Sequence, residues 1–274
     1  MTLLARDFEL VRKLVRERAG IVLDEGKEYL AESRLTAVAR EEGCASLQEL
    51  VARLRAERWN GLHRKVVEAM TTNETSFFRD ARCFEALRGR VLPDLVAERA
   101  DRRRLAIWCA GCASGQEAYS VAMLLREQFP RLSQWHVTLL ATDLSRHVLE
   151  RARAGRYKSL EVSRGLPESL LAKYFRRQGA EWEIVEELRA AVEFRELNLA
   201  EPWDIGGEMD LVLMRNVLIY LDADTRRKVF DRLLRVLGPH GYLVLGTAEA
   251  AMRIPDALER VDVARAALYR PRPR

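Results

Sequence analysis

From Leu105 onward, short apolar runs alternate with amphipathic stretches of helical length, and this alternation restricts the fold more than any other feature. The apolar runs cover residues 105–110, 136–143, 209–216 and 242–249, and the amphipathic stretches cover 116–129, 145–155 and 223–237. Strands that alternate with helices of this length predict a parallel, doubly wound α/β sheet. Right-handed crossovers in such a sheet place ligand-binding loops at the carboxyl ends of the strands.

The rest of the chain has a different pattern. Apolar residues recur at helical spacing through residues 1–70, which predicts a small N-terminal domain of four short helices, one of them capped by Ser46. Residues 71–104 read as a linker followed by a connecting helix, and 105–274 as the α/β domain. Within that domain, 155–190 interrupts the rhythm and predicts an inserted β-subdomain. It contains a short helix, GLPESLLAKYF, and a small antiparallel element, AEWEIVEELRAAVEF.

Composition narrows the class of protein. Apolar residues make up 48% of the chain, but no run of about 18 of them exists to cross a membrane. The N-terminus lacks the apolar stretch of a signal peptide, so we expect a cytoplasmic protein without membrane insertion. The net charge of +5 suits an acidic partner, or equally a solvated, Arg-rich surface. No basic run interleaved with aromatic residues is present, so we expect no nucleic-acid partner. We expect a monomer.

The loop that follows the first strand, residues 110–115 (AGCASG), is a candidate ligand site. Its small residues let a ligand approach the backbone, and the helix that follows offers free N–H groups. The spacing differs from GxGxxG, which disfavours a nicotinamide dinucleotide. A bare structural turn is an equal alternative. Cys109 and Cys112 in this region are interpreted as small packing residues. A redox or zinc site is disfavoured because a second ligand pair is missing nearby.

Polar residues at three further strand or helix ends strengthen the case for a ligand. Asp143 ends the second strand, where it can bind ribose hydroxyls or cap the next helix. Glu117 begins the first helix, where its charge also suits the helix dipole. Arg215 and Asn216 follow a third strand, although Arg215 could equally face solvent. Together these residues predict a ligand site at the carboxyl edge of the sheet.

The chain resembles the chemotaxis receptor methyltransferases, the CheR family, in five segments that occur in the family's order. These are TTNETSFFR (71–79), WCAGCASGQEAY (108–119), ATDLSRHVLERARAGRY (141–157), FRELNL (194–199) and LMRNVLIYL (213–221). The resemblance covers roughly residues 5 to 270. It implies a helical N-terminal domain and a class I methyltransferase domain with a small β-subdomain.

The resemblance also implies the chemistry. The methyl donor would be S-adenosylmethionine, the product S-adenosylhomocysteine, and the acceptors glutamate side chains on the cytoplasmic methylation helices of chemoreceptors. Carried over position by position, the cofactor-binding residues would be Asn73, Thr75, Arg79, Glu117, Asp143, Asn198, Leu199, Arg215 and Asn216. Arg79 and Tyr220 would be the catalytic residues, with Tyr220 near the transferred methyl group. No metal is expected.

Two departures from the family pattern matter. Many members have proline where Ala118 stands, a change that leaves cofactor binding intact. Members that dock a receptor's C-terminal pentapeptide carry a Gly-containing insertion in the hairpin of the β-subdomain, and RRQGAEWEIVEEL lacks it. We therefore expect recognition without the pentapeptide.

The chemistry needs little from the enzyme beyond alignment. A glutamate carboxylate has an unperturbed pKa of about 4.3, so it is ionised at neutral pH and needs no strong general base. Arg79 could orient this carboxylate or hold that of the cofactor, and Tyr220 could donate a hydrogen bond or pack. Two alternatives remain at this point: a non-catalytic S-adenosylmethionine-binding signalling module, and a methyltransferase that acts on RNA or a small molecule.

Overall fold

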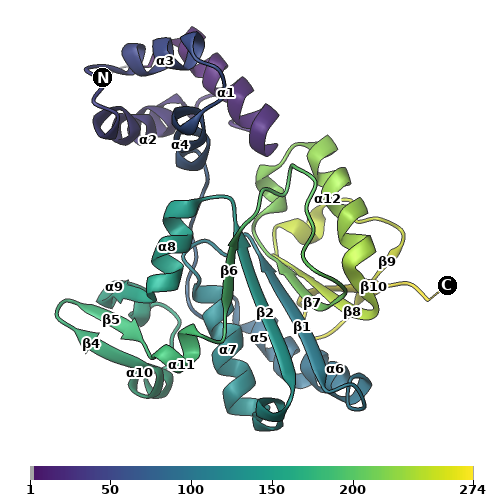
Figure 1. Cartoon of the computed structure of the whole chain (residues 1–274). Coiled ribbons are helices and arrows are strands. Elements are labelled where there is room, and N and C mark those ends of the chain that lie inside the picture. The colour runs from purple at the N-terminus through teal and green to yellow at the C-terminus, as the bar shows by residue number, and fades with distance from the viewer. Residues whose placement is uncertain (1–2, 274) are drawn as a thin grey trace. The chain divides into compact units, whose positions relative to one another are not determined.

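The computed structural model describes residues 3–273, and its N-terminal part consists of helices, as predicted (Figure 1). The four helices are α1 (Ala5–Ala19), α2 (Glu28–Glu41), α3 (Leu47–Ala56) and α4 (Gly61–Ala69). Ser46 caps α3 by accepting a hydrogen bond from Glu49 N, which confirms the predicted cap. Gly20 ends α1 in the left-handed conformation, with φ of 67°.

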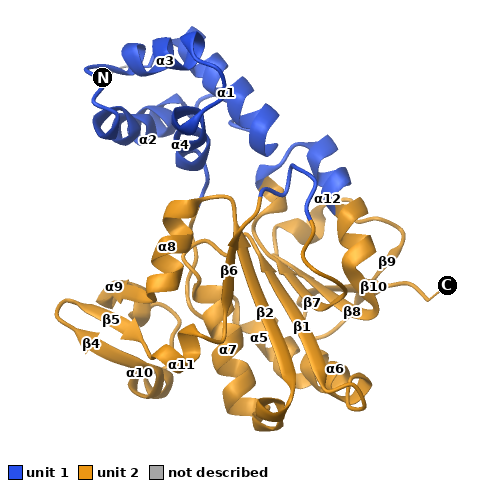
Figure 2. Cartoon of the chain, viewed as in Figure 1, with its two compact units in different colours: residues 1–72, 198–203, 220–229 blue, residues 73–197, 204–219, 230–274 orange. Residues whose placement is uncertain are grey.

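The chain divides into two compact units (Figure 2). Unit 1 comprises residues 1–72, 198–203 and 220–229, and unit 2 the remaining residues. Within unit 1, Ile21 forms an isolated antiparallel bridge with Leu221, and Asp222 N donates to Gly20 O. The end of α1 is thereby joined to residues that are distant in the sequence. Among the helices of residues 3–273, none is both long and apolar enough to span a membrane.

Unit 2 is built on a seven-stranded sheet with the order β6-β2-β1-β7-β8-β10-β9 (Figure 1). Its strands are β1 (Arg104–Ala110), β2 (His136–Asp143), β6 (Glu193–Glu196), β7 (Met209–Met214), β8 (Leu237–Leu245), β9 (Leu258–Val261) and β10 (Ala267–Pro271). The five adjacent strands β6, β2, β1, β7 and β8 are parallel, and β10 is antiparallel to both of its neighbours, β8 and β9. The predicted doubly wound α/β fold is confirmed. The strand order reverses at β1, where such sheets bind their ligands.

Helices connect these strands and cover the sheet. They are α5 (Ala81–Ala86), a π-helical turn η1 (Leu87–Val91), α6 (Leu92–Glu98), α7 (Gln116–Gln128), the 3-10 turns η2 (Pro130–Gln134), η3 (Leu218–Tyr220) and η4 (Glu249–Ala251), α8 (Arg146–Ala154) and α12 (Ala223–Val236). Leu95 of α6 and Met123 of α7 are buried in one core with Ile107 of β1 and Leu211 of β7. Full burial of each such side chain contributes about 1.5–3 kcal/mol, which fixes the helices on the sheet.

The predicted β-subdomain contains a three-stranded antiparallel sheet of order β3-β5-β4. Its elements are β3 (Arg156–Lys158), α9 (Ser159–Ser163), α10 (Glu168–Tyr174), β4 (Phe175–Gln178), β5 (Glu181–Ile184) and α11 (Glu186–Arg189). The short helix predicted in GLPESLLAKYF is α10. A two-residue turn, Gly179–Ala180, joins β4 to β5. Because β5 lies between the other two strands, β4 forms one edge of this sheet.

Two strand predictions were wrong. The stretch AEWEIVEELRAAVEF (180–194) does not form one antiparallel element, because 186–189 is a helix and β6, which begins at Glu193, joins the large sheet, parallel to β2. An alternating pattern shows that a strand exists but not which sheet it joins. The last predicted strand, 242–249, begins earlier and ends at Leu245. Residues beyond Leu245 leave the sheet because a buried carboxylate, that of Glu249, binds the N–H of Gly246.

Candidate active site

The loop after β1 is held in place by its neighbours. Gly111 N and Cys112 N both donate to Thr142 O, at 2.8 and 2.9 Å, which ties the loop to the end of β2. Gly111 has φ of 70°, and a Cβ there would lie 2.4 Å from Val217 Cγ2. Tyr157, from β3 of the small sheet, donates its hydroxyl to Ser114 O at 2.7 Å. The loop therefore has one geometry, with the turn after β7 directly against it.

Asp143 lies at the end of β2 beside this loop and is buried, with 8% of its surface exposed. Its Oδ2 accepts from Ala113 N at 2.8 Å, and its Oδ1 accepts from Ser145 N at 3.0 Å. Neither bond caps α8, whose N-cap is Ser145. The carboxylate instead braces the loop after β1, and each carboxylate oxygen can accept more than one hydrogen bond.

A buried ion pair joins Glu117 of α7 to Arg215 at the end of β7. Arg215 Nη1 and Glu117 Oε2 lie 2.8 Å apart, and the two side chains are 3% and 12% exposed. Arg215 Nη2 also donates to Arg79 O at 2.7 Å and lies 3.8 Å from Asp80 Oδ2. The solvent-facing alternative for Arg215 is thereby excluded. Burial raises the pKa of Glu117, the Arg215 charge opposes this rise, and the charge of Glu249 adds to it.

The segment that leads to Arg79 is anchored in unit 2. Phe77 is fully buried and packs edge-on against Tyr157 and Phe175 of the small sheet. Phe78 N donates to Ser120 Oγ at 2.9 Å. The partly buried guanidinium of Arg79 donates to Glu74 O at 2.8 Å, and its charge lowers the pKa of Glu117. The structure therefore brings together the predicted site residues Arg79, Glu117 and Arg215. Asp80, which was not predicted, lies with them.

Glu249 was missed by the sequence analysis. It is fully buried, and its carboxylate accepts from the backbone N–H groups of Asn216, Val217, Leu218 and Gly246. The available signal was an acidic residue just beyond an apolar strand. It was overlooked because residues 246–249 were assigned to the strand itself. Asp80 was likewise missed, and it has a left-handed backbone with φ of 66°.

The remaining predicted site residues are placed as follows. Asn73 and Thr75 lie on the irregular segment between α4 and α5, and both are partly buried. Asn198, Leu199 and Tyr220 group with unit 1. There Asn198 Nδ2 donates to Arg18 O at 2.7 Å, and Tyr220 O accepts from Val22 N at 2.8 Å. The roles of these five residues in cofactor binding or catalysis stay predictions.

Cys109 and Cys112 are buried free thiols. Burial raises the pKa of each well above its ordinary value, so neither is a ready thiolate. This agrees with their interpretation as small packing residues.

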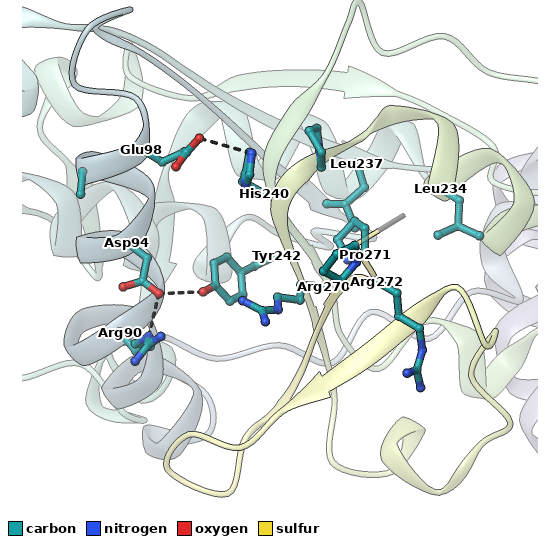
Figure 3. A pocket seen from close by; sticks show the side chains of 13 residues that line it. Arg90, Asp94, Glu98, Leu234, Leu237, His240, Tyr242, Arg270, Pro271 and Arg272 are labelled. Atoms are coloured by element: carbon teal, nitrogen blue, oxygen red, sulfur yellow. Dashed lines mark hydrogen bonds and ion pairs between the residues drawn. The ribbon is translucent and has the colours of Figure 1, made fainter.

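Figure 3 shows a large pocket of about 960 Å³ that contains none of the candidate ligand residues. It lies between α6, the first half of β8 and the C-terminal end of β10. Asp94 Oδ2 accepts from Tyr242 at 2.8 Å and from Arg90 at 2.6 Å, and His240 lies 3.4 Å from Glu98. Because His240 precedes the part of β8 that pairs with the middle of β7, this pocket is at the opposite edge from the loop after β1. The candidate ligand residues all lie elsewhere, so we assign the ligand site to the carboxyl edge.

Comparison with known proteins gives a consistent result for both parts of the chain. Residues 6–71 match the CheR methyltransferase all-alpha domain, and residues 73–267 match the CheR methyltransferase SAM binding domain. Chemotaxis protein methyltransferase 1 of Pseudomonas aeruginosa is 43% identical over 268 residues, which cover 96% of this chain and 97% of the relative. Chemotaxis protein methyltransferase Cher2 of Pseudomonas putida is 39% identical with the same coverage. A chemotaxis protein methyltransferase of Vibrio parahaemolyticus is 36% identical over 93% of this chain and 92% of its own length.

The side chains at the carboxyl edge fit S-adenosylmethionine, the ligand of the matched domain. Arg215 Nε is buried and donates no hydrogen bond within residues 3–273, so a ligand carboxylate would satisfy it. Glu117 offers a negative partner for a ligand ammonium group, and Asp143 offers acceptors for ribose hydroxyls. The chain belongs to the CheR methyltransferase family and uses S-adenosylmethionine as its methyl donor.

Proposed function

We propose that this enzyme transfers the methyl group of S-adenosylmethionine to glutamate carboxylates on the cytoplasmic methylation helices of chemoreceptors. The products would be glutamate methyl esters, which tune the receptors during sensory adaptation. The observation that carries the proposal is 43% identity, over 96% of the chain, to a protein named as a chemotaxis protein methyltransferase. The test is to incubate a receptor fragment with the enzyme and S-adenosylmethionine. Mass spectrometry of the fragment should then find the mass increase of one methyl group on glutamate residues and on no other residue type.

The chain's residues supply positioning for this reaction. S-adenosylmethionine would supply an electrophilic methyl group on a sulfonium. Asp143 would hold the ribose, and the Glu117–Arg215 pair would hold the charged amino-acid end. Arg79 would align a carboxylate through its planar guanidinium fork. Alignment and removal of water account for the rate enhancement, because the acceptor is already ionised.

Replacing Asp143 with alanine should weaken binding of S-adenosylhomocysteine by about 1–3 kcal/mol, because charge-assisted hydrogen bonds are lost. Calorimetry measures this loss. Asp94→Ala is the control, since it removes a hydrogen-bonded carboxylate, that which accepts from Arg90, at the opposite edge of the sheet. Unchanged affinity in Asp143→Ala would remove this residue from the site.

We further propose that receptors are recognised without their C-terminal pentapeptide. The charges of the small sheet do not exclude such a peptide, because Glu181 and Glu183 lie on the central strand β5 and not on its edge. Glu183 there is paired with Arg156 and Arg189, whereas the edge strand β4 carries Arg176 and Arg177. What supports the proposal is the two-residue turn Gly179–Ala180, which lacks the insertion typical of pentapeptide-binding members.

Methylation rates are therefore expected to be equal for a receptor fragment with and without its C-terminal tail. The double variant Arg176→Glu, Arg177→Glu should leave the rate on the tailed fragment unchanged, because the edge of β4 takes no part. Micromolar binding of an isolated tail peptide, lost in the double variant, would show that the β4 edge is a docking site after all.

A further inference from the structure

Glu249 is a buried carboxylate whose charge is met by backbone groups. Its Oε1 accepts from Val217 N and Leu218 N at 2.7 and 2.9 Å, and its Oε2 accepts from Asn216 N and Gly246 N at 2.8 and 2.6 Å. The residue is 0% exposed, and within residues 3–273 no lysine, arginine or histidine forms an ion pair with it. Hydrogen bonds to an ionised acceptor are about twice as strong as neutral ones, so this is a strong local clamp.

The clamped groups belong to the turn that carries the predicted ligand contacts. Asn216 has a left-handed backbone, with φ of 58°, which is uncommon for a residue other than glycine. Such a conformation persists only where its surroundings hold it in place. Glu249 donates nothing to the turn but accepts from three successive N–H groups of it, so it fixes the direction in which residues 215 and 216 leave β7.

Gly246 completes the clamp. A Cβ at position 246 would lie 2.6 Å from Glu249 Oε2 and 3.0 Å from both N and Nδ2 of Asn216. The carboxylate and the Asn216 amide therefore occupy the space that a side chain at 246 would need. The turn also lies against the loop after β1, because a Cβ on Gly111 would meet Val217 Cγ2. Residues from the ends of β1, β7 and β8 are thus locked at one edge of the sheet.

We propose that Glu249 is a positioning residue for the methyl-donor site, holding the 216–218 turn so that Asn216 faces the cofactor. The inference rests on the proposed role of Asn216. The function needs a carboxylate rather than an amide, since each oxygen accepts two N–H groups. A glutamine would place its NH₂ group against two of those donors and leave them unpaired.

The test compares Glu249→Gln with Asp210→Asn. Asp210 is also buried and also binds a backbone group, Ala106 N at 2.8 Å, but it lies at the start of β7, at the opposite edge. Both variants lose a buried carboxylate and are expected to lose stability. At a temperature where both are folded, calorimetry should show at least about tenfold weaker S-adenosylhomocysteine binding in Glu249→Gln and less than about twofold in Asp210→Asn. The KM for S-adenosylmethionine should rise more than the KM for the receptor.

Two further variants separate positioning from general destabilisation. Gly246→Ala retains Glu249 but displaces its carboxylate, so it should weaken cofactor binding even if Glu249→Gln fails to fold. Glu249→Gln combined with Asn216→Ala should bind no worse than Asn216→Ala alone, because Glu249 acts through that residue. Wild-type affinity in Glu249→Gln or Gly246→Ala, or additive losses in the double variant, would overturn the proposal. Wild-type affinity in Asn216→Ala would instead overturn the role of Asn216 in cofactor binding, and with it the proposal that Glu249 acts through Asn216.

Discussion

Replacing Arg215 with alanine is expected to destabilise the protein by about 3–5 kcal/mol and to abolish most of its activity, because the variant leaves the buried Glu117 carboxylate without its partner. The two side chains are 3% and 12% exposed, so bulk water does little to stabilise the remaining charge. The same change removes the donors to Arg79 O and the contact with Asp80. Urea unfolding measures the free energy, and adding Glu117→Gln should recover part of the lost stability.

The loss should depend on pH in a defined direction. Burial raises the pKa of Glu117 and Arg215 opposes the rise, so the pKa must climb further in Arg215→Ala. A carboxyl whose folded pKa exceeds its unfolded value of about 4.3 loses stability as pH rises through the folded pKa. The deficit of Arg215→Ala should therefore be larger at about pH 8 than at about pH 5. A deficit that is equal at both pH values, or that the Glu117→Gln change fails to reduce, would contradict this account of the pair.

Arg79→Ala is expected to lower kcat/KM by about 10- to 100-fold, because the variant loses one charge-assisted interaction with a carboxylate. Each tenfold loss corresponds to about 1.4 kcal/mol. Stability should change little, because the partly buried side chain donates to a single backbone oxygen, Glu74 O. Steady-state kinetics with each substrate varied in turn measures the effect. Arg82→Ala, at an exposed position three residues later, is the matched control.

The kinetics also identify which carboxylate Arg79 orients. A lower kcat with a raised KM for the receptor would assign Arg79 to the acceptor glutamate. A raised KM for S-adenosylmethionine, with weaker S-adenosylhomocysteine binding, would assign it to the cofactor. A folded variant with wild-type kcat and both KM values unchanged would remove Arg79 from the site.

Local sequence patterns were enough to predict the parallel sheet and to place four polar residues at its carboxyl edge. Glu117, Asp143, Arg215 and Asn216 could be placed there because each lies at the end of a strand or the start of a helix, and parallel strands end at one edge. The burial of Arg215 could not be predicted in the same way, since its partner Glu117 is 98 residues away. A charged residue at a strand end is predicted to be exposed unless its ion-pair partner is known.

The failures have the same cause, which is dependence on long-range contacts. The strand β6 was assigned to the small sheet because pattern alone cannot choose between two possible partners. The strands β9 and β10 were not predicted, and β10 contains Arg270 and Pro271, which weaken a strand signal. Glu249 was missed because an apolar run followed by GTAE looks like a continuing strand. Its four bonds to backbone N–H groups exist only in the folded chain.

Transfer of a labelled methyl group from S-adenosylmethionine to a receptor's cytoplasmic fragment tests the central claim most directly. We expect the label on the fragment, its release by mild base as the ester linkage requires, and its loss when the acceptor glutamates are replaced with alanine. Cofactor binding without transfer to any receptor fragment would indicate a non-catalytic signalling module. Transfer of a label that resists base would contradict glutamate esterification and identify a different acceptor.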